Sequence, residues 1–334
     1  MISGLNTHLN THIEGCKVPI LPVTVYTEMM FGCNPNSHQL QEGQRMKSIF
    51  SLSEQPWLFT FLFMLSWVAC NILVTIALTL IFRLKSVTQI PPPWVTLLTH
   101  ILTIFIVAPF VLGFPGKSHP YAAYLSEIRL TKVQPLLGLI LLGLSCYLIM
   151  ALSQAAGVLV YRLTQGLPVD WSFIRSSFVL ADELPPRSIS WLQSSISIFE
   201  EIFWRGVILA LFLRFYDQPK AILFSALSFG LMHTLTLLEG RPPVWTAGQV
   251  VWAAILGLFY GYVTVKTGSL LPAMLVHYLG NLFIAAINAY IQKNTSVPVQ
   301  AAYGVVFTLG IIPAALMLLW TRLFTTWWPM IQKL

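Results

Sequence analysis

The chain has 334 residues, of which 56% are hydrophobic and only 9% are charged, whereas about 25% of an ordinary soluble domain is charged. So little polar surface excludes a water-soluble globule, and near-average glycine and proline contents exclude a disordered or collagen-like chain. The formal net charge of +7 is explained by lysine and arginine at the ends of membrane spans rather than by a nucleic-acid partner. The composition therefore predicts a multi-pass membrane protein.

The N-terminal segment differs from the rest of the chain because it is polar and weakly patterned. It contains no apolar run long enough for a signal peptide, and Pro19, Pro22 and Pro35 oppose a continuous helix there. We therefore expect two parts, a polar tail at residues 1–55 and a transmembrane helical domain at residues 56–334.

From residue 56 onward, apolar stretches of about 20 residues alternate with short loops, and this is the length that a helix needs to cross about 30 Å of hydrocarbon. Because backbone polar groups in lipid must be satisfied within the segment, these spans are predicted to be helices. The expected fold class is all-α, a polytopic membrane helical bundle with about eight transmembrane helices. The predicted spans are residues 57–82, 94–113, 135–161, 189–213, 219–238, 245–265, 269–291 and 302–325.

The distribution of positive charge between alternate loops predicts the orientation. Eight spans place both termini on one side of the membrane, and the loops on that side hold more lysine and arginine than the loops on the other. By the positive-inside rule, this excess predicts cytoplasmic termini in a cell membrane, although the asymmetry is small. The expected partners are the lipid bilayer and a membrane-associated substrate, with no nucleic acid.

One predicted span, at residues 189–213, carries charges that a membrane helix normally avoids. Glu200, Glu201 and Arg205 all lie within it, and several serines precede them. Each charge at a helix centre costs about 2.5–3.5 kcal/mol on insertion scales, so this helix is predicted to lie inside the bundle rather than against lipid.

The two glutamates differ in whether their own helix offers an ion-pair partner. Glu201 lies four residues before Arg205, which is the favourable order for an ion pair on one helix face. Glu200 points about 100° away around the helix and has no partner in its own segment. A buried carboxylate of this kind is what a general base or acid requires.

Two other spans supply complementary polar groups. His233 lies in the fifth predicted span, and His277 and Asn281 lie one turn apart on the same face of the seventh. Counting 1.5 Å per residue from the span ends places Glu200, His233 and Asn281 in the middle third of the hydrocarbon core. A single site shared by three helices is therefore expected.

The order of these residues resembles a known family. Glu200-Glu201-x-x-x-Arg205, Phe229-x-x-x-His233 and His277-x-x-x-Asn281 are similar to the three motifs of the CAAX protease and bacteriocin-processing family, also called the Abi family. Its members are intramembrane endopeptidases, and the eukaryotic ones remove the three terminal residues of prenylated CAAX proteins. The resemblance covers about residues 185–290, which form the predicted catalytic core.

The resemblance implies a role for each motif residue. Glu200 would activate a water for attack on a peptide carbonyl, and His233 would position or deprotonate that water. His277 and Asn281 would stabilise the oxyanion of the tetrahedral intermediate, where preorganised donors have their largest effect.

The ion pair in the first motif is assigned a supporting role. The resemblance implies that Glu201 and Arg205 fix the helix and thereby the orientation of Glu200. The predicted catalytic residues are Glu200, Glu201, Arg205, His233, His277 and Asn281.

Two catalytic chemistries are compatible with these residues. Glu200, His233, His277 and Asn281 offer nitrogen and oxygen ligands that suit a divalent metal such as zinc. The same side chains also suit a metal-free glutamate protease. A serine or cysteine nucleophile is not expected, because the chain has no Gly-x-Ser-x-Gly motif and these three spans contain no cysteine.

The sequence therefore predicts an intramembrane endopeptidase that hydrolyses a peptide bond of a membrane-associated protein or peptide. The alternative is a non-catalytic membrane scaffold or bacteriocin-immunity protein of the same fold. A third hypothesis is a small-solute or proton-coupled transporter that uses Glu200, Glu201 and Arg205 as a relay, although the internal repeat typical of transporters is not evident.

Overall fold

A computed structural model of the chain describes residues 55–84, 86, 92–112, 120–164, 166, 187–238, 240, 242–294 and 310–327. All of the regular structure in these ranges is helical. The predicted tail lies outside the described residues except for Gln55, so the division at residue 55 stays a prediction.

The helices follow the chain in this order. Their bounds are α2 Pro56–Ile81, α3 Pro92–Leu102, η4 Thr103–Val107, α4 Ala108–Val111, α5 Pro120–Glu127, α6 Leu136–Thr164, α8 Arg187–Glu201, η6 Ile202–Ile208, α9 Leu209–Leu213, α10 Gln218–Met232, η7 His233–Leu237, α11 Pro243–Thr267, α12 Leu271–Asn294 and α14 Ile312–Thr326. Here η4 and η6 are π-helical segments within longer helices, and η7 is a 3₁₀ turn that extends α10.

The all-α fold class is confirmed, and each predicted span coincides with a helix. Part of the last predicted span, residues 302–309, lies outside the described residues. Five described helices are long and apolar enough to cross a membrane, so the count of eight stays a prediction. The five are Pro56–Ile81, Pro93–Val111, Leu136–Gly157, Gln218–Leu237 and Thr246–Thr267.

The continuous helix formed by α8, η6 and α9 is not among these five. Its first half is rich in serine, and its centre holds two glutamates and an arginine. Other parts of the protein surround this helix, because every residue from Glu201 to Phe212 is buried. The prediction that this helix lies inside the bundle is therefore confirmed.

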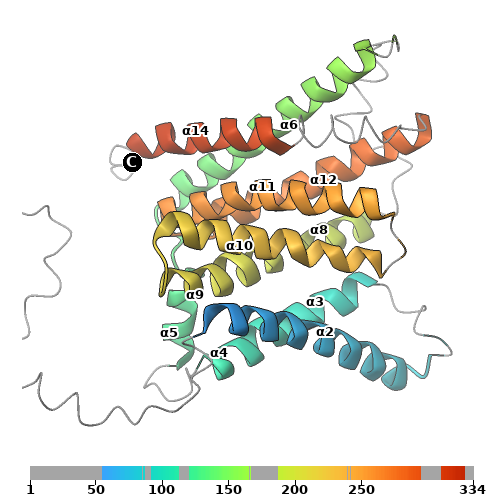
Figure 1. Cartoon of the computed structure of the whole chain (residues 1–334), viewed down its shortest axis with the longest axis vertical. Helices are drawn as coiled ribbons and strands as arrows, with labels where there is room; N and C mark the ends of the chain where they lie inside the picture. Colours follow the sequence, from blue (N-terminus) through green and yellow to red (C-terminus); the bar gives the residue numbers. More distant parts are fainter. Residues whose placement is uncertain are drawn as a thin grey trace, which may run out of the picture. The chain divides into compact units, whose positions relative to one another are not determined.

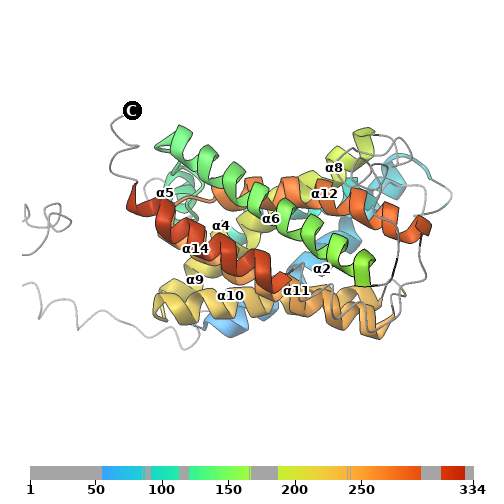
Figure 2. The ribbon, with the colours of Figure 1, turned by 90° about the horizontal axis from the view of Figure 1, so that it is seen from above.

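Helices on both sides enclose this central element. Within the described residues, α12 packs against α8 and α6, α10 packs against α11 and α9, and α3 packs against α8. Figure 1 shows α6 and α14 on one side, α2 and α3 on the other, and α8, α10, α11 and α12 between them. Figure 2, which views the molecule from above, shows α6 and α14 running diagonally across the middle layer.

The first motif runs into a π-helical segment, since its two glutamates end α8 whereas Arg205 lies within η6. The residues of η6 are all buried, and the backbone carbonyl of Trp204 within it accepts a hydrogen bond from the Ser225 hydroxyl of α10 at 2.9 Å. Single π-helical turns inside α-helices are frequent at functional sites. This turn sets the position of Arg205 relative to the two glutamates.

Glycines bring α10 and α11 into close contact. A Cβ atom added to Gly257 would lie 3.1 Å from Cα of Ala226, and one added to Gly261 would lie 3.0 Å from Cγ2 of Ile222. A side chain at either position would require the neighbouring atoms to shift by a few tenths of an ångström. The sequence Gly257-x-x-x-Gly261 therefore acts as a close-packing motif between helices, as predicted.

Candidate active site

A cavity of about 290 Å³ lies between α8, α10, α11 and α12. Four of the six predicted site residues line it, although they come from three helices and are separated by up to 81 positions in the chain. These four are Glu200, His233, His277 and Asn281. The remaining wall is formed by Ile196, Ser197, Phe229, Gln249, Trp252, Ala253, Leu256 and Tyr260.

The other two predicted residues lie behind the cavity wall. Glu201 and Arg205 are fully buried, and an Arg205 Nη1–H donates to Oε1 of Glu201 at 3.2 Å. The predicted ion pair at spacing four is therefore present.

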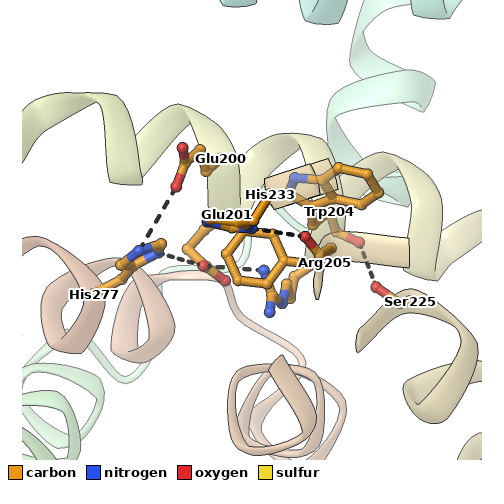
Figure 3. A network of polar contacts seen from close by, with 8 residues as sticks. Glu200, Glu201, Trp204, Arg205, Ser225, His233 and His277 are labelled. Carbon is orange, nitrogen blue, oxygen red and sulfur yellow. Dashed lines mark hydrogen bonds and ion pairs between the residues drawn. The ribbon is translucent and has the colours of Figure 1, made fainter. Parts of the chain in front are cut away.

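Glu201 has a second partner that the motif spacing does not reveal. Nδ1 of His277 lies 2.7 Å from the same Oε1 of Glu201. Because a carboxylate only accepts hydrogen bonds, Nδ1 carries the proton and donates it. Glu201 thus joins Arg205 on its own helix to His277 on α12, and its direct contact is with His277 rather than with Glu200 (Figure 3).

This bond turns the other ring nitrogen of His277 toward Glu200. Nε2 of His277 lies 3.6 Å from Oε2 of Glu200, which is too long for a direct hydrogen bond but within ion-pair range. The Glu200 side chain is 27% exposed, whereas that of Glu201 is fully buried. Of the two adjacent glutamates, Glu200 is therefore the one that faces the cavity.

His233 is held from the opposite wall. It is the first residue of η7, where α10 gives way to a 3₁₀ turn, and Nδ1 of its ring donates to the Phe229 carbonyl at 3.0 Å. In the neutral ring, a proton on Nδ1 leaves Nε2 as an acceptor. Phe229 also meets the His233 ring edge-on, with ring centroids 4.9 Å apart.

Aromatic rings hold the buried cation and His277 in place. The Arg205 guanidinium lies 4.3 Å from the centroid of Phe229 and 5.1 Å from that of Tyr260. The Tyr260 ring also stacks on His277, with centroids 5.0 Å apart and an interplanar angle of 19°. Tyr260 thus contacts both the ion pair and a cavity residue.

Two substitutions of Tyr260 distinguish the contribution of its ring to stability from that of its hydroxyl. The variant Tyr260→Leu loses both the contact with Arg205 and the stacking on His277, so its free energy of unfolding should fall by about 1–3 kcal/mol. The variant Tyr260→Phe keeps the ring and should stay close to the wild-type value. Thermal unfolding of the purified protein in detergent would measure this difference, and equal melting temperatures for the two variants would contradict it.

Sequence reasoning missed several residues near the site. Gln249, Trp252 and Tyr260 line the cavity from α11, and a glutamine within an apolar span was a usable signal for the first of them. His100 of α3 is also buried, donates through Nδ1 to the Thr96 carbonyl at 2.8 Å and interacts electrostatically with Glu200. Its signal was a histidine inside the second predicted span.

The predicted metal ligands do not form a metal-binding group. Among the described residues, no three His, Cys, Asp or Glu side chains are placed so that they could hold an ion. One nitrogen of His277 is engaged by Glu201, and one of His233 is engaged by a carbonyl. Metal-ligating histidines commonly donate their other ring N–H in this way, so the zinc ion stays a prediction.

Comparison with known families agrees with the motifs. A family model described as type II CAAX prenyl endopeptidase Rce1-like matches residues 190–283, a segment that runs from α8 into α12 and contains all three motifs. No curated protein and no solved structure matches the chain. The chain is an integral membrane protein, and its residues 190–283 are similar to the type II CAAX prenyl endopeptidases of the Rce1-like family.

Proposed function

We propose that the protein is an active intramembrane endopeptidase in which Glu200 activates a water molecule for hydrolysis of a peptide bond. The observation that carries this proposal is the shared cavity: Glu200, His233, His277 and Asn281 all line one space of about 290 Å³. Charged and polar groups at bilayer depth are costly and usually functional. A scaffold would not require these four groups to converge.

Glu200 is the proposed base. A water in the cavity donates a hydrogen bond to the Glu200 carboxylate, which takes its proton as the water oxygen bonds to the peptide carbonyl carbon. The carbonyl oxygen becomes an oxyanion. When the intermediate collapses, the C–N bond breaks and the protonated Glu200 returns the proton to the leaving amine, so that the carboxylate is regenerated.

His277 and Asn281 are the proposed oxyanion donors. They lie one turn apart on α12, so both can reach the same oxygen from one side. His277 already donates Nδ1–H to Glu201, and as an imidazolium it would also offer Nε2–H to the cavity.

His233 is proposed to position the attacking water. Its Nδ1–H is committed to the Phe229 carbonyl, so Nε2 is an acceptor that can hold the second hydrogen of the attacking water. The water would then be held between a carboxylate and an imidazole nitrogen. Two acceptors direct both hydrogens away from the substrate and leave an oxygen lone pair free for attack.

The proposed substrate is a membrane-associated protein or peptide, because the cavity lies within the helical bundle. Prenylated CAAX proteins are the substrates that the family name indicates. We propose further that the chain lies in the cell membrane with both termini in the cytoplasm, as the loop charges predict.

Reconstituted protein can test this function. Proteoliposomes would be incubated with a pool of peptides, some spanning the bilayer and some ending in a farnesylated CAAX sequence, and the products would be identified by mass spectrometry. We expect wild-type protein to cleave members of the pool, and the variant His233→Ala to leave them intact at the same protein density. Equal products from both proteins, or none from either, would instead favour the scaffold alternative.

A further inference from the structure

The wall of the cavity is divided between reacting groups and apolar groups. The carboxylate, imidazole and amide groups of the three motifs come from α8, η7 and α12. The helix α11 contributes five other residues and carries none of the three motifs. These five are Gln249, Trp252, Ala253, Leu256 and Tyr260.

The five residues of α11 form one stripe. Their spacing of three, one, three and four positions is that of a single helix face. The stripe begins with a polar amide at Gln249, continues with three apolar side chains and ends at Tyr260, which stacks on His277. It therefore runs along the cavity and ends beside the proposed oxyanion donors.

The cavity volume limits what can lie against this stripe. One helical turn with its side chains is a cylinder of about 500 Å³ for 3.6 residues, or about 140 Å³ per residue. The cavity, at about 290 Å³, is smaller than this turn. An extended peptide segment therefore suits this space better than a whole turn of helix.

We infer that the α11 stripe is the specificity wall of the site, where the residues beside the cleaved bond bind in extended form with an apolar side chain against Trp252, Ala253 and Leu256. This inference rests on the proposed peptidase function. The Gln249 amide, which has both donors and an acceptor, binds the substrate backbone at the polar end of the stripe. Ala253 is the smallest of the three apolar wall residues, so the substrate side chain fits over it.

Two substitutions on this wall should shift specificity in opposite directions. The variant Ala253→Leu fills the space over Ala253, and Leu256→Ala enlarges it. One methylene in an apolar pocket changes the discrimination between substrates by about 10–200-fold. We compare substrates that differ at one position beside the cleaved bond. In Ala253→Leu, the ratio of kcat/KM for leucine over alanine at that position should fall at least about tenfold. In Leu256→Ala, the preference should shift toward the larger phenylalanine.

The probe is a set of membrane peptides that differ only at that position, derived from a sequence that wild-type protein cleaves. The matched control is Val251→Leu, because Val251 lies on the same helix but is 51% exposed, and its preference should equal that of wild type. If Ala253→Leu does not accumulate, Ala253→Val replaces it with a smaller shift in the same direction.

The outcomes separate this inference from the function on which it rests. Opposite shifts in the two wall variants, with none in Val251→Leu, support the specificity wall. Unchanged preference in both wall variants, while cleavage still depends on His233, overturns the wall and leaves the peptidase function intact. Absence of wild-type cleavage overturns the function itself.

Discussion

Replacing Glu200 with glutamine is expected to lower kcat by about 10²–10⁴-fold, the usual contribution of a general base. Glutamine keeps the shape of the side chain but cannot take a proton from water. Because Glu200 contacts His277 at 3.6 Å without a direct hydrogen bond, the amide can occupy the same space. KM should therefore change much less than kcat, and steady-state kinetics on a cleaved peptide in proteoliposomes would measure both.

A carboxylate outside the cavity provides the control for this variant. Asp217 directly precedes α10, has a 57% exposed side chain and pairs with Lys220 at 3.5 Å. The variant Asp217→Asn should retain wild-type kcat. Normal turnover by Glu200→Gln would contradict the assignment of Glu200 as the general base.

Removing Arg205 is expected to have the largest effect on folding. In Arg205→Ala, the fully buried Glu201 loses its cation, and leaving one member of a buried pair costs about 3–5 kcal/mol. The contacts of the guanidinium with Phe229 and Tyr260 are lost as well. We expect the amount of folded protein in membranes to fall sharply, whereas Arg205→Lys, which keeps the charge, should lose less.

A double variant distinguishes the loss of charge balance from the loss of packing. Glu201→Gln combined with Arg205→Ala removes both charges, so it should accumulate better than Arg205→Ala alone. Membrane abundance and detergent thermal stability would report the difference. If Arg205→Ala matched the wild type in both measurements, the buried pair would have no stabilising role.

The helices were predictable because lipid imposes a simple rule on sequence. Apolar length gave the second span as residues 94–113, and the structure has a continuous helix over Pro92–Val111. The π-helical turns were not predictable, because they depend on contacts between helices such as the hydroxyl of Ser225 on the carbonyl of Trp204. The short helix Pro120–Glu127 was also missed, since it lies between spans where hydropathy carries little information.

The site shows the same division between local and distant information. The pairing of Glu201 with Arg205 follows from their spacing on one helix, and the motifs indicated which side chains share the cavity. The bond from His277 to Glu201 joins residues 76 positions apart, and no local pattern contains it. The lining residues of α11 were missed because an apolar stripe looks the same whether it faces lipid, a core or a substrate.

The charged centre of the helix Arg187–Leu213 has a consequence for how the protein is assembled. An isolated segment with Glu200, Glu201 and Arg205 at its midpoint partitions poorly into hydrocarbon, and the partner of Glu201 on α12 is synthesised 76 residues later. The helix must therefore be retained at the translocon, or beside the earlier helix α3, until the C-terminal half emerges. Biogenesis of this protein is then a cooperative event, and ribosome-bound chains that stop before His277 should hold this segment in an incompletely inserted state.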